Sequence, residues 1–212
     1  MQKEFIEVPR TARYYLIGET DNPKQIWICL HGYGQQSKYF AAKLKSLDNG
    51  KNLIIIPEGL SRFYLSGYHG RVGATWMTSD DRLTDINDNH RYLDILLNSL
   101  IEKYSMKNQS INVFAFSQGI ATACRWISDT NFNFKRAILW AGSIPPEMDW
   151  VKYSSKFNEM RIQYVFGTED EFFTSEKIDE NTRLWEKAQI DFQLITFDGR
   201  HEIIEKELIT LL

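Results

Sequence analysis

The stretch Ile111-Asn-Val-Phe-Ala-Phe-Ser-Gln-Gly-Ile-Ala121 decides the fold class. A β-rich apolar run leads into Ser117, and a helix-compatible run with small residues follows at once. A sharp strand-to-helix turn at a serine needs small residues two before and two after it, because the two backbones cross closely there. Ala115 and Gly119 meet that need. The stretch therefore predicts a strained turn that lifts the Ser117 hydroxyl above a sheet. The plainer alternative is a serine that caps a helix packed on a strand.

Apolar runs like this one recur along the chain and predict the sheet. The runs are residues 14–17, 26–30, 53–56, 111–116, 137–140, 162–166 and 192–197. Several are continuously apolar, which is typical of parallel strands covered on both faces. Helical patterns separate many of them, at 37–47, 84–104, 118–129, 175–189 and 202–211. Strand and helix in alternation predict an α/β fold: a doubly wound, mostly parallel sheet of about seven strands with helices on both faces.

Length, composition and charge set the outer limits of the interpretation. A chain of 212 residues, 43% hydrophobic and without a linker-like tract, predicts one domain over residues 1–212. Lys and Arg number 25 against 28 Asp and Glu, a net charge of −3 that favours no nucleic-acid partner. No apolar run is long enough for a membrane span, and no secretory signal is visible. Cys29 and Cys124 lie in apolar segments, so we expect free thiols and a cytoplasmic location.

The end of the 26–30 run offers backbone N–H groups for an anion. There the sequence reads His31-Gly-Tyr-Gly34, and its glycines let amides turn toward a developing charge. An oxyanion hole takes one donor from such a loop and one from the residue after the nucleophile. We assign the backbone amides of Tyr33 and Gln118. His31 itself is interpreted as a residue that shapes the loop, although proton transfer is the alternative.

An acid and a base follow the last two strands. Glu169, Asp170 and Glu171 come after the 162–166 run, and Asp170 is chosen because Gly-x-x-Asp places it at the loop tip. A solvated acidic turn that caps the next helix is the alternative. His201 follows the last predicted strand, where an imidazole can act as general base and then general acid. Asp198 is only three residues away and is too constrained to orient it.

Ser117, Asp170 and His201 occur in the chain order Ser…Asp…His, each after a strand. This is the order found in α/β-hydrolases. A serine hydroxyl needs a neighbouring base, and the base needs an orienting acid. We therefore predict a serine hydrolase that cleaves carboxylic esters through an acyl-enzyme.

Other polar residues favour no second site. His69 and His90 are interpreted as a loop residue and a solvated helix residue. A metal site is not predicted, because His-Glu-x-x-His is absent and His90 with Asp94 would supply only two ligands from one helix face.

Five stretches together resemble a known family. They are Leu30-His-Gly-Tyr-Gly34, Ala115-Phe-Ser-Gln-Gly119, Gly142-Ser-Ile-Pro145, Gly167-Thr-Glu-Asp170 and the His201 loop. The chain resembles the phospholipase/carboxylesterase family of small α/β-hydrolases, which also contains the acyl-protein thioesterases. The resemblance implies an esterase fold, a triad of Ser117, Asp170 and His201, and no cofactor. It departs from the family at Ala115, where a glycine is usual, at residues 172–174 and along 61–81.

Substrate contacts are predicted from loop positions. Residues 58–81 fit neither a helical nor a strand period, and we interpret them as either a surface loop or a wall of the pocket. The candidates for an apolar acyl or alcohol pocket are Phe63, Trp76, Ile144 and Phe172. The resemblance places Trp76 near the acyl site.

Two alternative functions and one possible assembly remain open beside ester hydrolysis. One is cleavage of S-acyl thioesters, which the same serine machinery serves. Another is a non-catalytic ligand-binding protein of the same fold. Aromatic residues, 14% of the chain, are also numerous enough to supply a homodimer patch.

Overall fold

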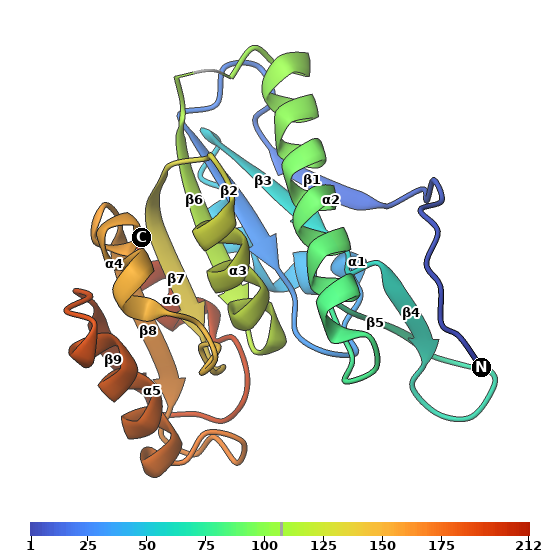
Figure 1. Cartoon of the computed structure of the whole chain (residues 1–212). Coiled ribbons are helices and arrows are strands. Elements are labelled where there is room, and N and C mark those ends of the chain that lie inside the picture. The colour runs from blue at the N-terminus through green and yellow to red at the C-terminus, as the bar shows by residue number, and fades with distance from the viewer. Residues whose placement is uncertain (107) are drawn as a thin grey trace.

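The computed structural model describes residues 1–106 and 108–212, which form a seven-stranded sheet in the order β1-β3-β2-β6-β7-β8-β9 (Figure 1). The strands are β1 (Tyr14–Gly18), β2 (Gln25–Leu30), β3 (Asn52–Pro57), β6 (Ser110–Phe116), β7 (Phe134–Trp140), β8 (Arg161–Gly167) and β9 (Gln193–Phe197). Neighbouring strands run parallel except β1, which is antiparallel to β3. The predicted mostly parallel sheet is confirmed, and each apolar run forms the strand expected of it.

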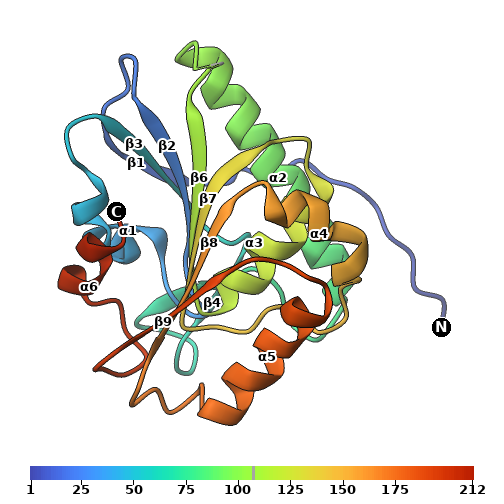
Figure 2. The same ribbon diagram turned by 90° about the vertical axis from the view of Figure 1, so that its left-hand side faces the viewer.

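Helices cover both faces of the sheet, as Figure 2 shows edge-on. One face carries α1 (Ser37–Phe40) and α6 (Glu205–Thr210), and the other carries α2 (Arg82–Lys103), α3 (Gln118–Asp129), α4 (Trp150–Asn158) and α5 (Ser175–Lys187). The continuous apolar runs follow from this arrangement. In β3, Leu53 packs in the core under α2 and α3, whereas Ile54 packs in the core under α1 and α6. A strand buried on both faces has no polar side to show.

Two helical regions differ from expectation. Residues 37–47 form one turn of α-helix and then the 3₁₀ turns Ala41–Lys43 and Lys45–Leu47, not one helix. Helix α4 was not predicted. Its start has a recognisable signal, because the Asp149 side chain accepts a hydrogen bond from the Lys152 amide nitrogen at 3.1 Å, as an N-cap residue does.

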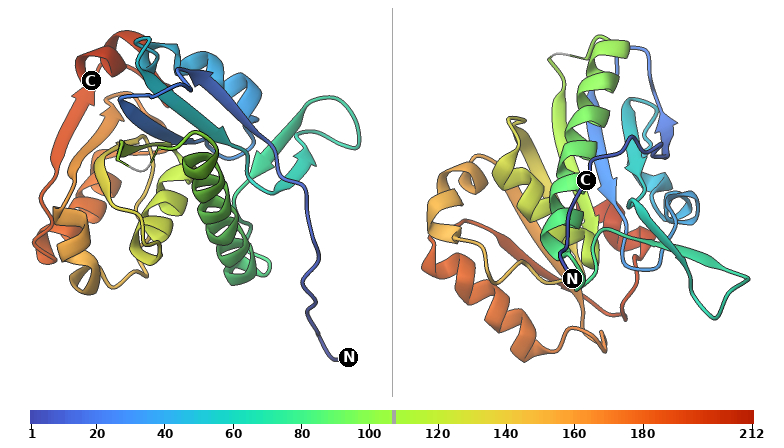
Figure 3. Two further views of the ribbon diagram at one scale, coloured as in Figure 1. Left: turned by 90° about the horizontal axis from the view of Figure 1, so that it is seen from above. Right: turned by 45° about the vertical axis from the view of Figure 1, so that its right-hand side comes forward.

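The segment 58–81, interpreted as a surface loop or a wall of the pocket, contains a β-hairpin. Strand β4 (Ser61–Tyr64) pairs antiparallel with β5 (Val72–Thr75), and the hairpin projects from the body of the molecule (Figure 3). Gly67 and Gly70 in its turn have φ values of 58° and 89°, which glycine adopts at little cost. Four-residue strands are too short to show a clear period in the sequence.

Both cysteines are free and buried, as predicted. Burial raises the pKa of the Cys29 thiol well above its usual value and also raises that of Cys124. The thiols therefore stay protonated and pack as small apolar side chains. Among the described residues, no helix combines the length and the apolar character needed to cross a membrane.

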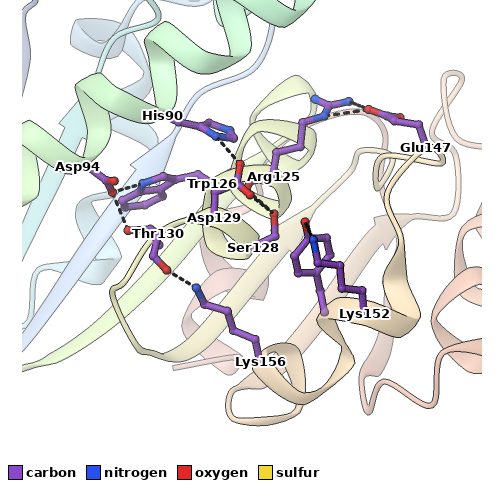
Figure 4. Close-up of polar contacts among 11 residues, drawn as sticks. His90, Asp94, Arg125, Trp126, Ser128, Asp129, Thr130, Glu147, Lys152 and Lys156 are labelled. Atoms are coloured by element: carbon purple, nitrogen blue, oxygen red, sulfur yellow. Dashed lines mark hydrogen bonds and ion pairs between the residues drawn. The ribbon is translucent and has the colours of Figure 1, made fainter.

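Polar side chains tie α3 to the helices beside it (Figure 4). Asp94 on α2 accepts hydrogen bonds from the Trp126 indole at 2.7 Å and from the Thr130 hydroxyl at 2.6 Å. Lys156 on α4 donates to the Thr130 carbonyl oxygen. These contacts fix the C-terminal end of the helix that begins directly after Ser117.

His90 is not the solvated helix residue that the sequence indicated. It is buried where α2 faces α3, and its Nδ1 lies 3.2 Å from Asp129 Oδ2 (Figure 4). Burial lowers the pKa of His90, and the Asp129 carboxylate opposes that shift. His69 lies in the hairpin turn, as expected.

Candidate active site

Ser117 occupies a strained turn between β6 and α3, with φ = 53° and ψ = −120°. Its amide nitrogen donates to the Trp140 carbonyl oxygen at 2.9 Å, which ties the turn to the end of β7. A Cβ at Gly119 would lie 2.5 Å from the Leu30 carbonyl oxygen, and Ala115 is fully buried. Gly119 therefore leaves no room for a side chain beside β2, and Ala115, the other small residue that the sequence singled out, lies in the core.

The imidazole of His201 joins Ser117 to Asp170. Its Nε2 lies 3.0 Å from the Ser117 Oγ, and its Nδ1 lies 2.8 Å from Asp170 Oδ2. A carboxylate only accepts hydrogen bonds, so in the neutral form of the ring Nδ1 carries the hydrogen and the lone pair of Nε2 faces the hydroxyl. Side chains separated by 84 and 31 positions in the sequence thus form one chain of hydrogen bonds.

Asp170 is held in place by its own loop. The Asp170 side chain is fully buried, and its other oxygen, Oδ1, accepts from the amide nitrogens of Phe172 at 2.9 Å and Phe173 at 3.2 Å. The neighbouring Glu169 and Glu171 are exposed. The Glu169 amide donates to the Gly199 carbonyl oxygen at 2.9 Å, which joins this loop to the one that carries His201.

The glycine loop after β2 lies directly against the serine turn. A Cβ at Gly32 would lie 3.1 Å from the Ser117 Cβ. In the part of the chain that the structure describes, neither the Tyr33 nor the Gln118 amide nitrogen donates to a protein acceptor. The Gln118 amide directly follows Ser117 and the Tyr33 amide directly follows Gly32, so both belong to the two segments that meet here.

His31 is fully buried and both of its ring nitrogens bond to the backbone. Nδ1 lies 2.7 Å from the Gly32 carbonyl oxygen, and Nε2 accepts from the Gly59 amide at 3.0 Å. Burial lowers the pKa of His31 to about 4, although the bond to Gly32 and the charge of Glu58 oppose the shift. A neutral ring held at both ends shapes the loop, in line with the first of the two readings of His31.

The predicted pocket residues divide into two groups. Phe172 is 53% exposed with its ring 4.9 Å from that of His201, and Phe63 packs on the Tyr33 ring at 5.1 Å. Trp76 and Ile144 are each 1% exposed and belong to the core, which corrects their placement in an accessible pocket wall. The Trp76 indole N–H donates to the His31 carbonyl oxygen at 2.8 Å, so its polar edge supports the loop after β2.

Sequence reasoning missed two residues beside this site. Phe173 stacks on the His201 ring with an interplanar angle of 14°, and its position three residues after Asp170 was a usable signal. Thr75 at the end of β5 bonds to the Gln118 side chain. Nothing in the sequence indicates that contact, because it depends on how the hairpin folds back.

A mostly parallel sheet, a strained serine turn after a central strand, and an acid and a histidine after later strands define the α/β-hydrolase fold. A model of the phospholipase/carboxylesterase family matches residues 14–212. The chain belongs to that family. The search of curated proteins gives no match.

Solved structures share the fold at low sequence identity. The Zea mays acyl-protein thioesterase 2 aligns with a TM-score of 0.73 at 15% identity, over 95% of this chain and 96% of that one. A carboxylesterase from Mesorhizobium loti gives 0.73 at 12% identity, over 94% and 93%. The Bacillus cereus carboxylesterase gives 0.70 at 15% identity, over 94% and 91%. At such identities the likeness shows the fold alone.

His31 predicts a pH-dependent loss of stability. The unfolded imidazole binds a proton near pH 6.5 and the folded one only near pH 4, so between these values the unfolded state holds the extra proton. We expect the free energy of unfolding to fall by about 3 kcal/mol between pH 6.5 and 4 relative to a His31→Gln variant, since each unit of pKa is about 1.4 kcal/mol. Urea unfolding of both proteins across this range measures the difference. If the free energy of unfolding changed with pH in the same way in both proteins, His31 would not be a buried imidazole that stays neutral in the folded state.

Proposed function

We propose that the protein is a serine hydrolase that cleaves carboxylic esters. The observation that carries the proposal is the hydrogen-bonded row of Ser117, His201 and Asp170, with 3.0 Å from Oγ to Nε2 and 2.8 Å from Nδ1 to Oδ2. A serine hydroxyl is a weak nucleophile by itself, and this row supplies the base and the orienting acid that activate it. Membership of the phospholipase/carboxylesterase family supports the same chemistry.

In the first half of the reaction, the Ser117 Oγ attacks the carbonyl carbon of the ester while His201 Nε2 takes the hydroxyl proton. The carbonyl oxygen becomes an oxyanion, which the backbone amides of Tyr33 and Gln118 stabilise. The tetrahedral intermediate collapses, the bond to the alcohol oxygen breaks, and His201 gives its proton to the departing alcohol. Ser117 is left as an acyl ester.

In the second half, water attacks the acyl carbon while His201 takes a proton from it. The same two amides hold the new oxyanion, and collapse releases the carboxylic acid and returns the proton to Ser117. Asp170 remains a carboxylate and stabilises the imidazolium that forms in both halves. Its buried position and its two backbone hydrogen bonds fix the ring for this role.

The exposed Phe172 ring, edge-on to His201, and the Phe63 ring beside Tyr33 are the apolar contacts proposed for the substrate. The same machinery serves thioesters, so kinetics on matched oxygen and sulfur esters separate the two substrate classes.

Replacing Ser117 by alanine removes the nucleophile. We expect turnover of a short-chain aryl ester to fall by at least about 10⁴-fold, since losing a triad serine leaves only the residual effect of binding and oxyanion donors. A fluorophosphonate probe should label the wild-type protein and not the variant. The matched control is Ser99→Ala on the exposed side of α2, which should keep wild-type turnover. Undiminished turnover by Ser117→Ala would reject this serine as the nucleophile.

Asp170→Asn tests the orienting acid at nearly constant shape. The amide oxygen can still accept from the Phe172 and Phe173 amides, but an NH₂ group facing His201 favours the wrong tautomer. We expect kcat for the aryl ester to fall about 10³- to 10⁴-fold. Glu171→Gln makes the same chemical change at an exposed neighbour and should leave kcat within twofold. Equal kcat values for the two variants would remove Asp170 from the mechanism.

A further inference from the structure

Strand β5 is in contact with both backbone segments proposed as oxyanion donors. On the side of Tyr33, the Gly34 amide donates to the Ala74 carbonyl oxygen at 2.8 Å, and the Ala74 amide donates to the Gln35 carbonyl oxygen at 3.1 Å. This pair of bonds is an isolated antiparallel bridge between Gln35 and Ala74. The loop that carries the Tyr33 amide is therefore hydrogen-bonded to β5 at the two residues that follow Tyr33.

The backbones of the loop and the strand approach closely at two glycines, Gly34 and Gly73. A Cβ at Gly73 would lie 2.5 Å from the Gly34 carbonyl oxygen and 2.7 Å from its Cα. The position of β5 therefore limits the position of the loop, and the Leu65 side chain lies beside both glycines.

The Gln118 side chain forms hydrogen bonds with the two residues that directly follow β5. The Trp76 amide lies 3.2 Å from Gln118 Oε1, and the Met77 carbonyl oxygen lies 3.0 Å from Gln118 Nε2. An amide N–H can only donate and a carbonyl can only accept, so these two partners fix which way the Gln118 carboxamide is turned.

Thr75 connects these bonds at the end of β5. Its hydroxyl oxygen lies 2.8 Å from the Met77 carbonyl oxygen and 3.0 Å from both Oε1 and Nε2 of Gln118. It accepts from Nε2, and its one hydrogen goes to the Met77 oxygen or to Gln118 Oε1. Thr75 is 1% exposed, so water does not replace a bond that is lost there.

We propose that Thr75 and the Gln118 carboxamide are positioning residues that set the Gln118 amide relative to the Tyr33 amide, with β5 as the shared support. The inference rests on the proposed function. Oxyanion donors act mainly on charge that develops in the transition state, so loosening one of them lowers kcat and leaves KM nearly unchanged.

Thr75→Val removes the hydroxyl at constant shape and leaves every backbone amide in place. We expect kcat for an aryl ester to fall about tenfold, within the loss that a displaced oxyanion donor causes. KM should stay within twofold, and the pH profile of kcat should keep its shape. Thr75→Ser restores the hydroxyl and should recover most of the loss.

Thr78→Val is the matched control. It makes the same change three residues further on, at an exposed threonine whose hydroxyl donates to the Asp80 carbonyl oxygen, and it should keep wild-type kinetics. A wild-type kcat in Thr75→Val would overturn the inference. Equal losses of kcat in Thr75→Val and Thr75→Ser would also overturn it, as would a loss of kcat/KM that comes entirely from a higher KM.

Should Thr75→Val fail to fold, Gln118→Met makes the test from the other side of the contact. It keeps the length of the side chain and the backbone amide, and the same fall in kcat at constant KM is expected, whereas unchanged kcat would overturn the inference. If the wild-type protein neither turns over esters nor takes up a fluorophosphonate, the proposed function fails and the inference falls with it. An active wild-type protein with unaffected variants rejects the inference alone.

Discussion

The backbone conformation of Ser117 is the constraint on which the site depends. A non-glycine residue at φ = 53° and ψ = −120° is strained by about 1–3 kcal/mol, and such a residue persists only where its surroundings leave it no other state. Here a Cβ at Gly142 would lie 2.3 Å from the Ser117 carbonyl oxygen, so the chain after β7 closes on the turn from one side. The Leu30 carbonyl oxygen closes on Gly119 from the other. The serine is therefore held above the sheet by packing of backbone on backbone.

The sheet order explains why distant residues meet there. Parallel strands end at one edge, and β6, β7, β8 and β9 are consecutive neighbours, so the loops after them lie side by side. Ser117 follows β6, Asp170 follows β8 and His201 follows β9, while β7 supplies the carbonyl oxygen that binds the Ser117 amide. The Trp140 indole, at the end of β7, donates to the Glu202 carbonyl oxygen at 2.8 Å and steadies the histidine loop.

Much of this could be predicted from the sequence, because its signals are local. Strands buried on both faces are continuously apolar, and small residues on both sides of Ser117 mark a sharp strand-to-helix turn. What could not be predicted depends on folded neighbours. An aromatic residue such as Trp76 can face a substrate or the core, and the sequence does not show that the folded chain buries it with its indole on the His31 carbonyl oxygen. His90 on a helix looks solvated until α3 covers it. The four-residue strands of the hairpin gain their order from pairing.

The most direct test of the account is a crystal structure of the protein after reaction with a fluorophosphonate. Its phosphorus should be bonded to the Ser117 Oγ, with one phosphonyl oxygen within hydrogen-bond distance of both the Tyr33 and the Gln118 amide nitrogens. His201 Nε2 should remain beside the modified oxygen. Phosphorus on another residue, or a phosphonyl oxygen turned away from both amides, would contradict the account.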